Sequence, residues 1–557
     1  MENKYVDITV QYVDEIRCRI LTRKEILYSL KTEFSFFANG YKFHPLYKQG
    51  RWDGRISMID GKGLFYNGLL KSLLTHCKER GLSIKVEDIQ KYMPTKIEDS
   101  VIDQLSSYIK FPPYDYQQRS VKEALSKRKL LILSPTSSGK SLIAYMLYRY
   151  CVDNNLPLLI TVPSVGLVTQ LLSDFESYVS DDHNVAENVH TIYTGQEKIT
   201  DKLCTISTWQ SCTNMDKEWF SRYKFYICDE AHGSSAKEIS AIIDNLNNCP
   251  YRIGMTGTLN GTNIHEIEMH ARFGEIFKMV TTRELIDRGL VTDIDINCVR
   301  LIHDKIEIDR FHGFCKNDYQ REIDYLLNST ERNDYIINLG LTLPNTTLML
   351  FNRIEGHGMK LMEQLEEKAL QYRKKVFYIA GSVKAKERER IRKQLDGEMP
   401  LFHVITFNDG STATIDANAI SQDDLAVYRD KSLPVDLLDE QYMFIQPGAN
   451  NRTVTNIELV EGSYILLASY GTMSTGISIK KLHNLIFCHP FKGKILNLQS
   501  IGRILRKSND KNKVYLYDLI DDYRKGKKIN HTYKHGTARM EIYESEEFNY
   551  ELIEQKI

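Results

Sequence analysis

The stretch Ser134-Pro-Thr-Ser-Ser-Gly-Lys-Ser141 carries the residue types that hold a triphosphate. Gly139 allows successive backbone N–H groups at a helix N-terminus to approach an anion closely. Lys140 supplies a positive charge for the β- and γ-phosphates, and the Ser141 hydroxyl is placed to bind Mg²⁺. Ser134 stands where the usual motif has its first glycine, so a serine-rich turn between core elements is the alternative. The nucleotide-binding interpretation also assigns four further residues to the loop: Pro135, Thr136, Ser137 and Ser138.

A second cluster, Asp229-Glu-Ala-His232, offers acidic groups for the same site. Asp229 is expected to share Mg²⁺ with Ser141, and Glu230 is expected to orient and deprotonate the attacking water. An ordinary helix start is the alternative, which the phosphate loop upstream disfavours. Four other polar or flexible positions are interpreted as couplers between the nucleotide and a neighbouring domain: His232, Thr256, Gly257 and Thr258.

Cationic groups that suit a triphosphate lie in Gln499-Ser-Ile-Gly-Arg-Ile-Leu-Arg506. Arg503 and Arg506 are three residues apart, so both can point from one helical face. An arginine supplied to a triphosphate stabilises transition-state charge. Gln499 and Gly502 are assigned to coupling, and a pair of surface arginines is the alternative.

The acidic and phosphate-loop clusters follow apolar runs that read as strands of one sheet. In a doubly wound parallel sheet the carboxyl ends of the strands share one edge, where ligands bind. We therefore expect an ATP-binding motor domain over about 110–290. Gln117, in the helix pattern before the first run, can hydrogen-bond an adenine edge. The runs are 130–133, 158–162, 205–210, 225–228 and 252–255.

A second alternating series over about 325–530 predicts another α/β sheet, one without a phosphate loop of its own. Such a domain cannot hold a triphosphate alone, but it can lend Arg503 and Arg506 across a cleft. The predicted strands are 347–351, 376–379, 464–468, 485–488 and 514–517.

Length and composition indicate a soluble, multidomain, intracellular protein. A chain of 557 residues is too long to fold around a single hydrophobic core. Lys+Arg equal Asp+Glu at 73 each, so the net charge does not indicate a nucleic-acid partner. No apolar run approaches the length of a membrane span, and the N-terminus lacks the pattern of a signal peptide. The ten cysteines are scattered, which fits a reducing compartment such as the cytoplasm.

The region 1–105 reads as a small α/β domain that carries a possible nucleic-acid platform. Arg51, Trp52 and Arg55 combine cations with an aromatic ring that can stack on a base. In the alternative interpretation, Trp52, Tyr41 and Phe43 form the core of that domain and the cations are a solvated rim.

Two further segments depart from the motor pattern. Residues 398–461 hold 3 Lys/Arg and 11 Asp/Glu and read as an insertion with a hairpin turning at Asn408-Asp-Gly410. Because DNA would be repelled, a protein contact or a passive decoration is expected there. Residues 531–557 read as a helical tail that follows a basic run. That run, 523–535, suits either a phosphate backbone or a solvated linker.

Taken together, these motifs resemble those of superfamily 2 helicases. Ser134–Ser141, Asp229–His232 and Thr256–Thr258 are similar to motifs I, II and III of that family, Ser474–Ser478 to motif V, and Gln499–Arg506 to motif VI. The resemblance implies two RecA-like motor domains, use of ATP with Mg²⁺, and six strand-contacting residues: Pro163, Gly195, Thr208, Gln210, Thr475 and Gly476.

Over nearly the whole chain the sequence resembles the recombination and repair helicases of T-even-like phages, for example at Phe34–Ile56, Phe273–Lys278 and Tyr517–Asp522. The resemblance implies a monomeric ATP-dependent DNA helicase in the host cytoplasm. Its partners would be branched, single-stranded and duplex DNA and an RNA–DNA hybrid, and its activities Holliday-junction migration, fork regression and R-loop dissolution. An RNA helicase and an ATP-gated clamp without productive hydrolysis remain alternatives.

Overall fold

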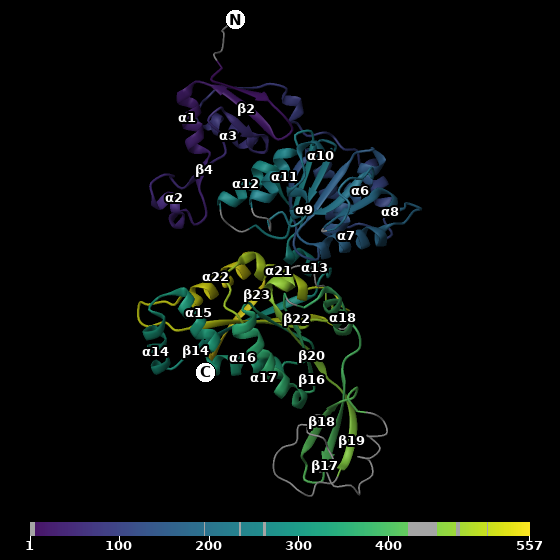
Figure 1. The fold of residues 1–557 in the computed structure, drawn as a ribbon, viewed down its shortest axis with the longest axis vertical. Coiled ribbons are helices and arrows are strands. Elements are labelled where there is room, and N and C mark those ends of the chain that lie inside the picture. Colours follow the sequence, from purple (N-terminus) through teal and green to yellow (C-terminus); the bar gives the residue numbers. More distant parts are fainter. Residues whose placement is uncertain are drawn as a thin grey trace. The chain divides into compact units, whose positions relative to one another are not determined.

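The computed structural model describes residues 6–193, 195–232, 236–259, 263–381, 383–420, 454–474, 479–508 and 511–557. Contacts between residues divide the chain into two units, Met1–Thr281 and Thr282–Ile557. The first contains a small N-terminal domain and a large parallel sheet, and the second contains another large parallel sheet with an insertion (Figure 1).

The N-terminal domain is a four-stranded sheet with the order β5-β2-β1-β6. Its strands β1 and β2 are antiparallel, and alternate residues such as Ile8 and Val10 face a buried core. A two-stranded hairpin, β3 with β4, carries the short helix α2 between its strands. The bounds are β1 Ile8–Tyr12, β2 Arg17–Thr22, α1 Lys24–Glu33, β3 Ser35–Phe37, α2 Pro45–Lys48, β4 Arg55–Ser57, β5 Leu64–Tyr66, α3 Leu70–Glu79, β6 Ile84–Val86 and α4 Asp99–Ser107.

The first large sheet has seven strands in the order β13-β7-β12-β11-β8-β10-β9, all parallel. Strands covered on both faces read as continuous apolar runs. The strands are β7 Lys129–Leu133, β8 Leu158–Val162, β9 Val189–Ile192, β10 Cys204–Thr208, β11 Phe225–Cys228, β12 Tyr251–Thr256 and β13 Glu275–Lys278. The helices are α5 Asp115–Lys127, α6 Lys140–Asp153, α7 Val165–Tyr178, α8 Val185–Asn188, α9 Trp209–Thr213, α10 Lys217–Ser221, α11 Ala236–Asn245 and α12 Asn263–Phe273.

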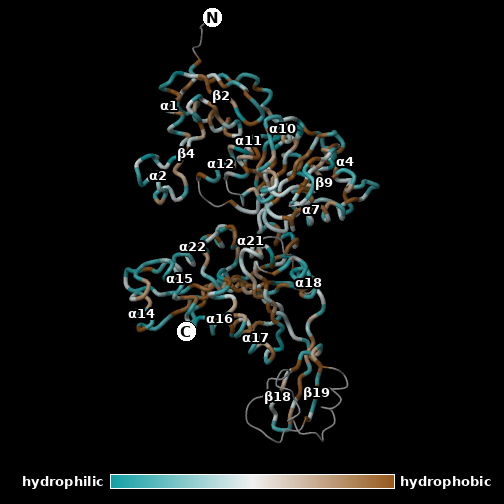
Figure 2. The backbone as a smooth tube through the Cα atoms, in the orientation of Figure 1, coloured by the Kyte–Doolittle hydropathy of each residue, from teal (hydrophilic) through white to brown (hydrophobic). Residues whose placement is uncertain are grey.

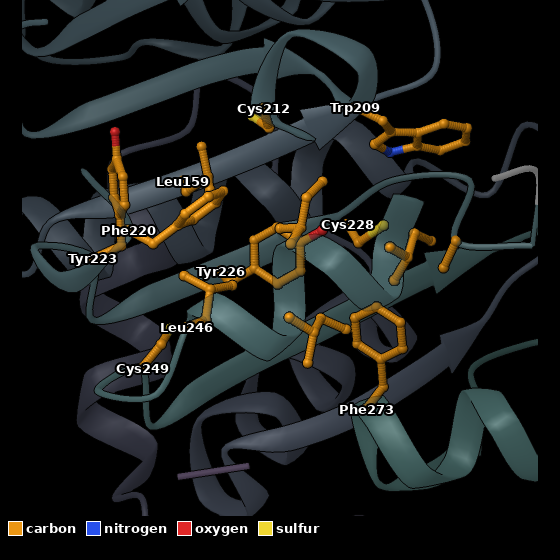
Figure 3. Packing of buried hydrophobic residues seen from close by; sticks show 14 of the residues in the cluster. Leu159, Trp209, Cys212, Phe220, Tyr223, Tyr226, Cys228, Leu246, Cys249 and Phe273 are labelled. Atoms are coloured by element: carbon orange, nitrogen blue, oxygen red, sulfur yellow. The ribbon is translucent and has the colours of Figure 1, made fainter. Parts of the chain in front are cut away.

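Aromatic and sulfur side chains fill one face of this sheet (Figure 3). Leu159, Tyr226 and Cys228 come from its central strands and pack with Trp209 and Phe273 from neighbouring elements. The cysteines in this cluster are small core residues, and burial raises the pKa of the Cys228 thiol to about 12. This core fixes the strand ends at which the predicted site residues lie.

Arg252 of β12 joins the N-terminal domain to this sheet. Its guanidinium is fully buried and donates to the carbonyl oxygens of Glu15 (2.6 Å), Cys249 (3.2 Å) and Arg272 (3.2 Å). Nearby, Arg17 pairs with Asp244 at 2.6 Å. The N-terminal domain is therefore tied to the first large sheet by buried polar contacts as well as by apolar packing.

The second large sheet also has seven parallel strands, in the order β16-β20-β15-β21-β22-β14-β23. Both sheets confirm the predicted pair of RecA-like doubly wound motor domains. The strands are β14 Asp293–Ile302, β15 Thr347–Phe351, β16 Lys374–Ile379, β20 Ser463–Ser469, β21 Asn484–Phe487, β22 Lys513–Asp522 and β23 Asn549–Lys556. The helices are α13 Thr282–Asp287, α14 Lys305–Cys315, α15 Tyr319–Asn328, α16 Thr330–Thr342, α17 Met359–Ala369, α18 Ala385–Leu395, α20 Tyr470–Ser474, α21 Lys494–Ile504 and α22 His531–Ser545.

The C-terminal tail differs from the helix predicted over 531–557. Helix α22 ends at Ser545, and Glu547 adopts a left-handed backbone with φ +58° while Phe548 N–H bonds the Tyr543 carbonyl oxygen. This is a helix-ending geometry, and the buried Phe548 side chain anchors the turn. The last residues then form β23, which pairs with β14 along its whole length. The prediction of a purely helical tail is therefore wrong.

The insertion contains a three-stranded antiparallel sheet in the order β18-β17-β19. Its hairpin turns at Asn408-Asp-Gly410, as predicted, with Gly410 at φ +80°. Four residues give this small sheet its own core: Ile405, Phe407, Ala413 and Ile415. The strands are β17 Leu401–Phe407, β18 Thr412–Asp416 and β19 Val454–Glu461.

Hydrophobic stretches follow the strands of the large sheets, and hydrophilic ones follow the outer turns and helix faces (Figure 2). Among the helices of the described ranges, none has the length and apolar character that crossing a membrane requires.

Candidate nucleotide site and nucleic-acid contacts

The phosphate-loop candidate connects the end of β7 to the start of α6. Ser134 N–H donates to the Thr256 carbonyl oxygen at 2.9 Å, which fixes the loop beside β12. Gly139 has φ +83°, and a Cβ there would lie 2.2 Å from Gln117 Nε2. Only glycine fits this position without strain or displacement, as a loop built from backbone N–H groups requires.

Ser134 replaces the usual first glycine without opening the loop. Its side chain is fully buried and its hydroxyl hydrogen-bonds the Ser138 hydroxyl. Ser138 Oγ in turn donates to the Pro135 carbonyl oxygen at 2.7 Å. The serine that replaces the usual glycine therefore makes a hydrogen bond within the loop. Thr136 and Ser137 complete its exposed side, with Ser137 at φ +68°.

Gln117 lies underneath this loop. Its Oε1 accepts from Tyr114 N–H at 2.9 Å, and its Nε2 donates to the Ser138 carbonyl oxygen at 3.1 Å. The side chain is 3% exposed. In this structure the amide supports the loop, and its predicted contact with adenine stays a prediction.

Lys140 faces the acidic cluster at the end of β11. Its Nζ lies 3.2 Å from Glu230 Oε1, and both side chains are mostly covered. Glu230 has a left-handed backbone, φ +49°, which is uncommon for this residue type and typical of constrained turns at functional sites. Gly257 borders the same space, because a Cβ there would lie 3.6 Å from Lys140 Nζ. The structure thus brings motifs I, II and III together.

Asp229 has a buried carboxylate oxygen that could bind a cation. Its backbone N–H bonds the Thr161 carbonyl oxygen at 2.9 Å, while its buried Oδ1 has no hydrogen-bond partner within the described ranges. Burial first, and then the Glu230 carboxylate, raise the pKa of Asp229 to about 6, against the pull of Lys140. A buried carboxylate oxygen with an open coordination position fits Mg²⁺, as predicted for Asp229 together with Ser141.

His232 connects the acidic cluster to β12. Its Nδ1 lies 2.5 Å from Thr256 Oγ1, and Thr256 Oγ1 donates to the Thr258 carbonyl oxygen at 2.9 Å. Burial lowers the pKa of His232 even though Glu230 opposes this shift. The chain of contacts leads from the water-activating candidate to Thr258, which is the geometry expected of coupling residues.

Three of the strand-contacting candidates lie beyond the ends of adjacent strands. β8 and β10 pair in register up to Val162 and Thr208, so Pro163 and Gln210 emerge at the same edge of the sheet. Thr208 Oγ1 accepts from Ser211 N–H at 3.4 Å and begins helix α9, which leaves Gln210 exposed. Gly195 lies in an exposed turn at φ +88°. The motif V candidates, Thr475 and Gly476, lie outside the described residues.

The candidate DNA-binding residues of the N-terminal domain differ in their exposure to solvent. Arg51 is exposed, whereas the half-buried Trp52 donates its Nε1–H to the Arg55 carbonyl oxygen at 2.8 Å. The Arg55 guanidinium lies over the Phe37 ring at 4.6 Å. Phe43 is 80% exposed and therefore not a core residue, contrary to the alternative interpretation. Phe37, at 45% exposed, is a second exposed aromatic ring near these cations.

Helix α21 carries three of the four motif VI candidates: Gln499, Gly502 and Arg503. Arg503 is 8% exposed. Arg506 lies past the helix end at Ile504, so the prediction that both arginines share one helical face is wrong. The Thr292 N–H donates to the Leu505 carbonyl oxygen at 2.8 Å, and the Thr292 hydroxyl donates to the Arg506 carbonyl oxygen. These bonds hold the two residues just past the helix, and Lys511 Nζ donates to the carbonyl oxygen of its last residue, Ile504, at 2.7 Å.

Tyr178 is a residue of this site that sequence reasoning missed. Its hydroxyl lies 2.8 Å from Ser141 Oγ, the predicted Mg²⁺ ligand. Tyr178 ends α7 and is far from every recognised motif in sequence, so no pattern signals it.

Comparison with known proteins shows what this chain resembles in sequence and fold. Two family models match: DNA helicase UvsW, N-terminal, over residues 7–87, and Type III restriction enzyme, res subunit, over residues 110–261. The ATP-dependent DNA helicase uvsW of Enterobacteria phage T4 is 29% identical over 98% of this chain and 99% of its own. A crystal structure of the UvsW helicase from Bacteriophage T4 is 33% identical, with a TM-score of 0.45. That match covers 49% of this chain and 100% of the crystallised chain.

The DNA-bound ATP-dependent Type ISP restriction-modification enzyme LlaBIII shares the fold at 14% identity and a TM-score of 0.50. That match covers 96% of this chain and 38% of the enzyme. Identity to the T4 proteins, by contrast, extends from the N-terminal domain through both large sheets. The chain is therefore similar over nearly its whole length to the T4 UvsW helicase, and its residues 7–87 match the UvsW N-terminal family model.

Proposed function

We propose that this protein is an ATP-dependent DNA helicase and translocase that acts on branched DNA. The observation that carries the proposal is the meeting of Lys140, Glu230 and Asp229 at the carboxyl ends of β7 and β11. A phosphate-binding cation, a candidate base and an unpartnered carboxylate oxygen lie there within one site.

The chain's own residues divide the work of hydrolysis. The loop Ser134–Ser141 holds the phosphates through its backbone and through Lys140. Mg²⁺, held by Ser141 and Asp229, neutralises charge on the phosphate oxygens when it is bound. Glu230 orients the attacking water and accepts its proton. By their resemblance to motif VI, Arg503 and Arg506 are proposed to stabilise the charge that develops.

His232 and Thr256 link hydrolysis to movement. Their contact connects the acidic cluster to the segment Thr256–Thr258. A change at Glu230 on loss of the γ-phosphate is proposed to pass through this segment. The loops at Pro163, Gly195, Thr208 and Gln210 are proposed to hold DNA. Arg51, Trp52 and Arg55 of the N-terminal domain are proposed to add a second contact with DNA.

Branched DNA is proposed because the whole-chain relative is named a DNA helicase and because a second DNA-binding surface suits a substrate with several arms. The activities would be Holliday-junction branch migration, fork regression and R-loop dissolution. An RNA helicase has the same acidic cluster and is the second candidate. An ATP-gated clamp is disfavoured, because a clamp needs no water-activating carboxylate such as Glu230.

ATPase and unwinding assays on single-stranded, forked, four-way and R-loop substrates and on structured RNA test the proposal. We expect the branched DNAs to stimulate hydrolysis most and to be unwound. Lys140→Ala should abolish hydrolysis while DNA binding persists, and Lys122→Ala, an exposed lysine paired with Asp99, is the control. If only structured RNA stimulates hydrolysis, the substrate is RNA and the DNA proposal is wrong. ATP turnover by Lys140→Ala would refute the assignment of Ser134–Ser141 as the phosphate loop.

A further inference from the structure

The Ser141 hydroxyl is held by a residue that no recognised motif contains. Ser141 Oγ and Tyr178 Oη lie 2.8 Å apart, at the start of α6 and the end of α7. The Tyr178 ring meets the Tyr145 ring edge-on, with centroids 5.7 Å apart. Its carbonyl oxygen accepts from Lys110 N–H at 2.8 Å. The phenol is therefore fixed through its ring, its main chain and its hydroxyl.

The segment that holds Tyr178 also leads to the residue that supports the loop from below. Ile109 and Val179 form a β-bridge next to the Lys110 contact. A few residues later the chain reaches Gln117, which donates to the Ser138 carbonyl oxygen. The phosphate loop is thus supported at two points, by Gln117 at Ser138 and by Tyr178 at Ser141.

A serine that binds a metal ion has a specific requirement that Tyr178 can meet. The hydroxyl offers oxygen lone pairs to the cation, so its single proton must point to an acceptor elsewhere. A phenol oxygen at 2.8 Å is such an acceptor, and it also selects one rotamer of the serine. Partners of metal ligands commonly orient those ligands and tune affinity in this way.

We propose that Tyr178 is a positioning residue for Mg²⁺–nucleotide binding, in which its hydroxyl accepts the Ser141 proton and aims the Ser141 lone pairs at the cation. Tyr178 itself touches neither metal nor nucleotide. The inference rests on the proposed function of the loop and deepens it, because it extends the metal site to helix α7.

The test is a fluorescence titration of the full-length protein with a labelled ADP, at varied Mg²⁺ and in EDTA. Tyr178→Phe keeps the ring and removes only the hydroxyl. We expect it to raise the Mg²⁺ concentration for half-maximal binding by about two- to tenfold, the effect of one hydrogen bond, and to leave binding in EDTA unchanged. Tyr145→Phe is the matched control, because its ring lies in the same cluster while its hydroxyl bonds Arg149 at 3.2 Å.

A double-mutant cycle separates positioning from general support of the fold. In a Ser141→Ala background, Tyr178→Phe should have no further effect on the Mg²⁺ requirement, because Tyr178 acts through Ser141. An equal effect in both backgrounds would assign Tyr178 a purely structural role and overturn the proposal.

Two other results have separate meanings. An unchanged or lower Mg²⁺ requirement in Tyr178→Phe would show that the phenol has no effect on the cation or competes with it. That result would refute the positioning role of Tyr178 and leave the proposed function standing. Wild-type binding that ignores Mg²⁺ would refute the metal site of the proposed function, and the role of Tyr178 with it. Thermal unfolding of each variant verifies that the compared proteins are folded.

Discussion

Lys140 Nζ lies 3.2 Å from Glu230 Oε1, so the cation proposed to hold phosphates is paired with the carboxylate proposed to activate water. The pair keeps two mostly covered charges neutral in the absence of nucleotide, which limits the cost of burying them. Phosphate oxygens compete for Lys140 in an occupied site, and we expect Glu230 then to be available to the water. Nucleotide binding and activation of the base are linked through this one contact.

Replacing Arg252 tests the joint between the N-terminal domain and the first large sheet. Arg252→Met removes donors to the carbonyl oxygens of Glu15, Cys249 and Arg272 and leaves buried acceptors unpaired. We expect a loss of about 2–4 kcal/mol in the free energy of unfolding of the first unit, measured by urea denaturation. Lys122→Met, which breaks an exposed pair with Asp99 in the same unit, should cost less than about 1 kcal/mol. Equal losses would mean that Arg252 does not secure the joint.

Lys129 should make stability depend on pH. Burial first, then repulsion by Arg252, lowers the pKa of Lys129 to about 7, while Glu15 opposes the shift. The unfolded chain then binds more protons than the native one between about pH 7 and 10, so stability rises with pH across that window. Lys129→Met should flatten this rise and stabilise the protein at neutral pH by on the order of 1–3 kcal/mol. Parallel pH profiles of unfolding for the two proteins would contradict the assignment.

Removing the insertion should leave the motor intact. Gly462 N–H bonds the Pro400 carbonyl oxygen at 2.7 Å, so the two ends already meet and residues 401–461 can be deleted with little strain. The deletion loses the pair of Lys375 with Asp416, whose expected cost is about 0–1 kcal/mol. ATP hydrolysis and circular dichroism should therefore match the full chain. Loss of folding would show that the insertion is part of the second motor domain.

Arg51 and Arg55 should contribute to DNA binding through phosphates. The double change to alanine is expected to weaken binding and to reduce the slope of log K against log salt by about 1.4–1.8 for two lost contacts. Arg23→Ala, an exposed arginine of the same domain paired with Asp7, is the control and should leave the slope unchanged. Identical slopes for the double variant and the wild type would remove the N-terminal domain from the DNA-binding surface.

Local patterns predicted those parts of the molecule whose structure local sequence determines. The buried strands before Ser134 and Asp229 contain continuous apolar runs, and their carboxyl ends lie at one edge as the parallel sheet requires. The hairpin turn at Asn408-Asp-Gly410 follows from backbone preferences within three residues.

Features set by distant contacts were not predictable in this way. The chain just past the end of α21 is held by Thr292, far away in sequence, which donates to the carbonyl oxygens of Leu505 and Arg506. The final residues form β23 because the edge of β14 is available to them, although the segment also has a helical pattern. Tertiary hydrogen bonds decided each of these outcomes.

The central claim is that Glu230 activates water for ATP hydrolysis that drives strand separation. The most direct measurement is the steady-state ATPase rate of Glu230→Gln on forked DNA, with ATP and DNA binding measured on the same preparation. We predict that both ligands still bind while turnover falls at least about 100-fold, as expected when a positioned proton acceptor is lost. Turnover near the wild-type rate would contradict the account.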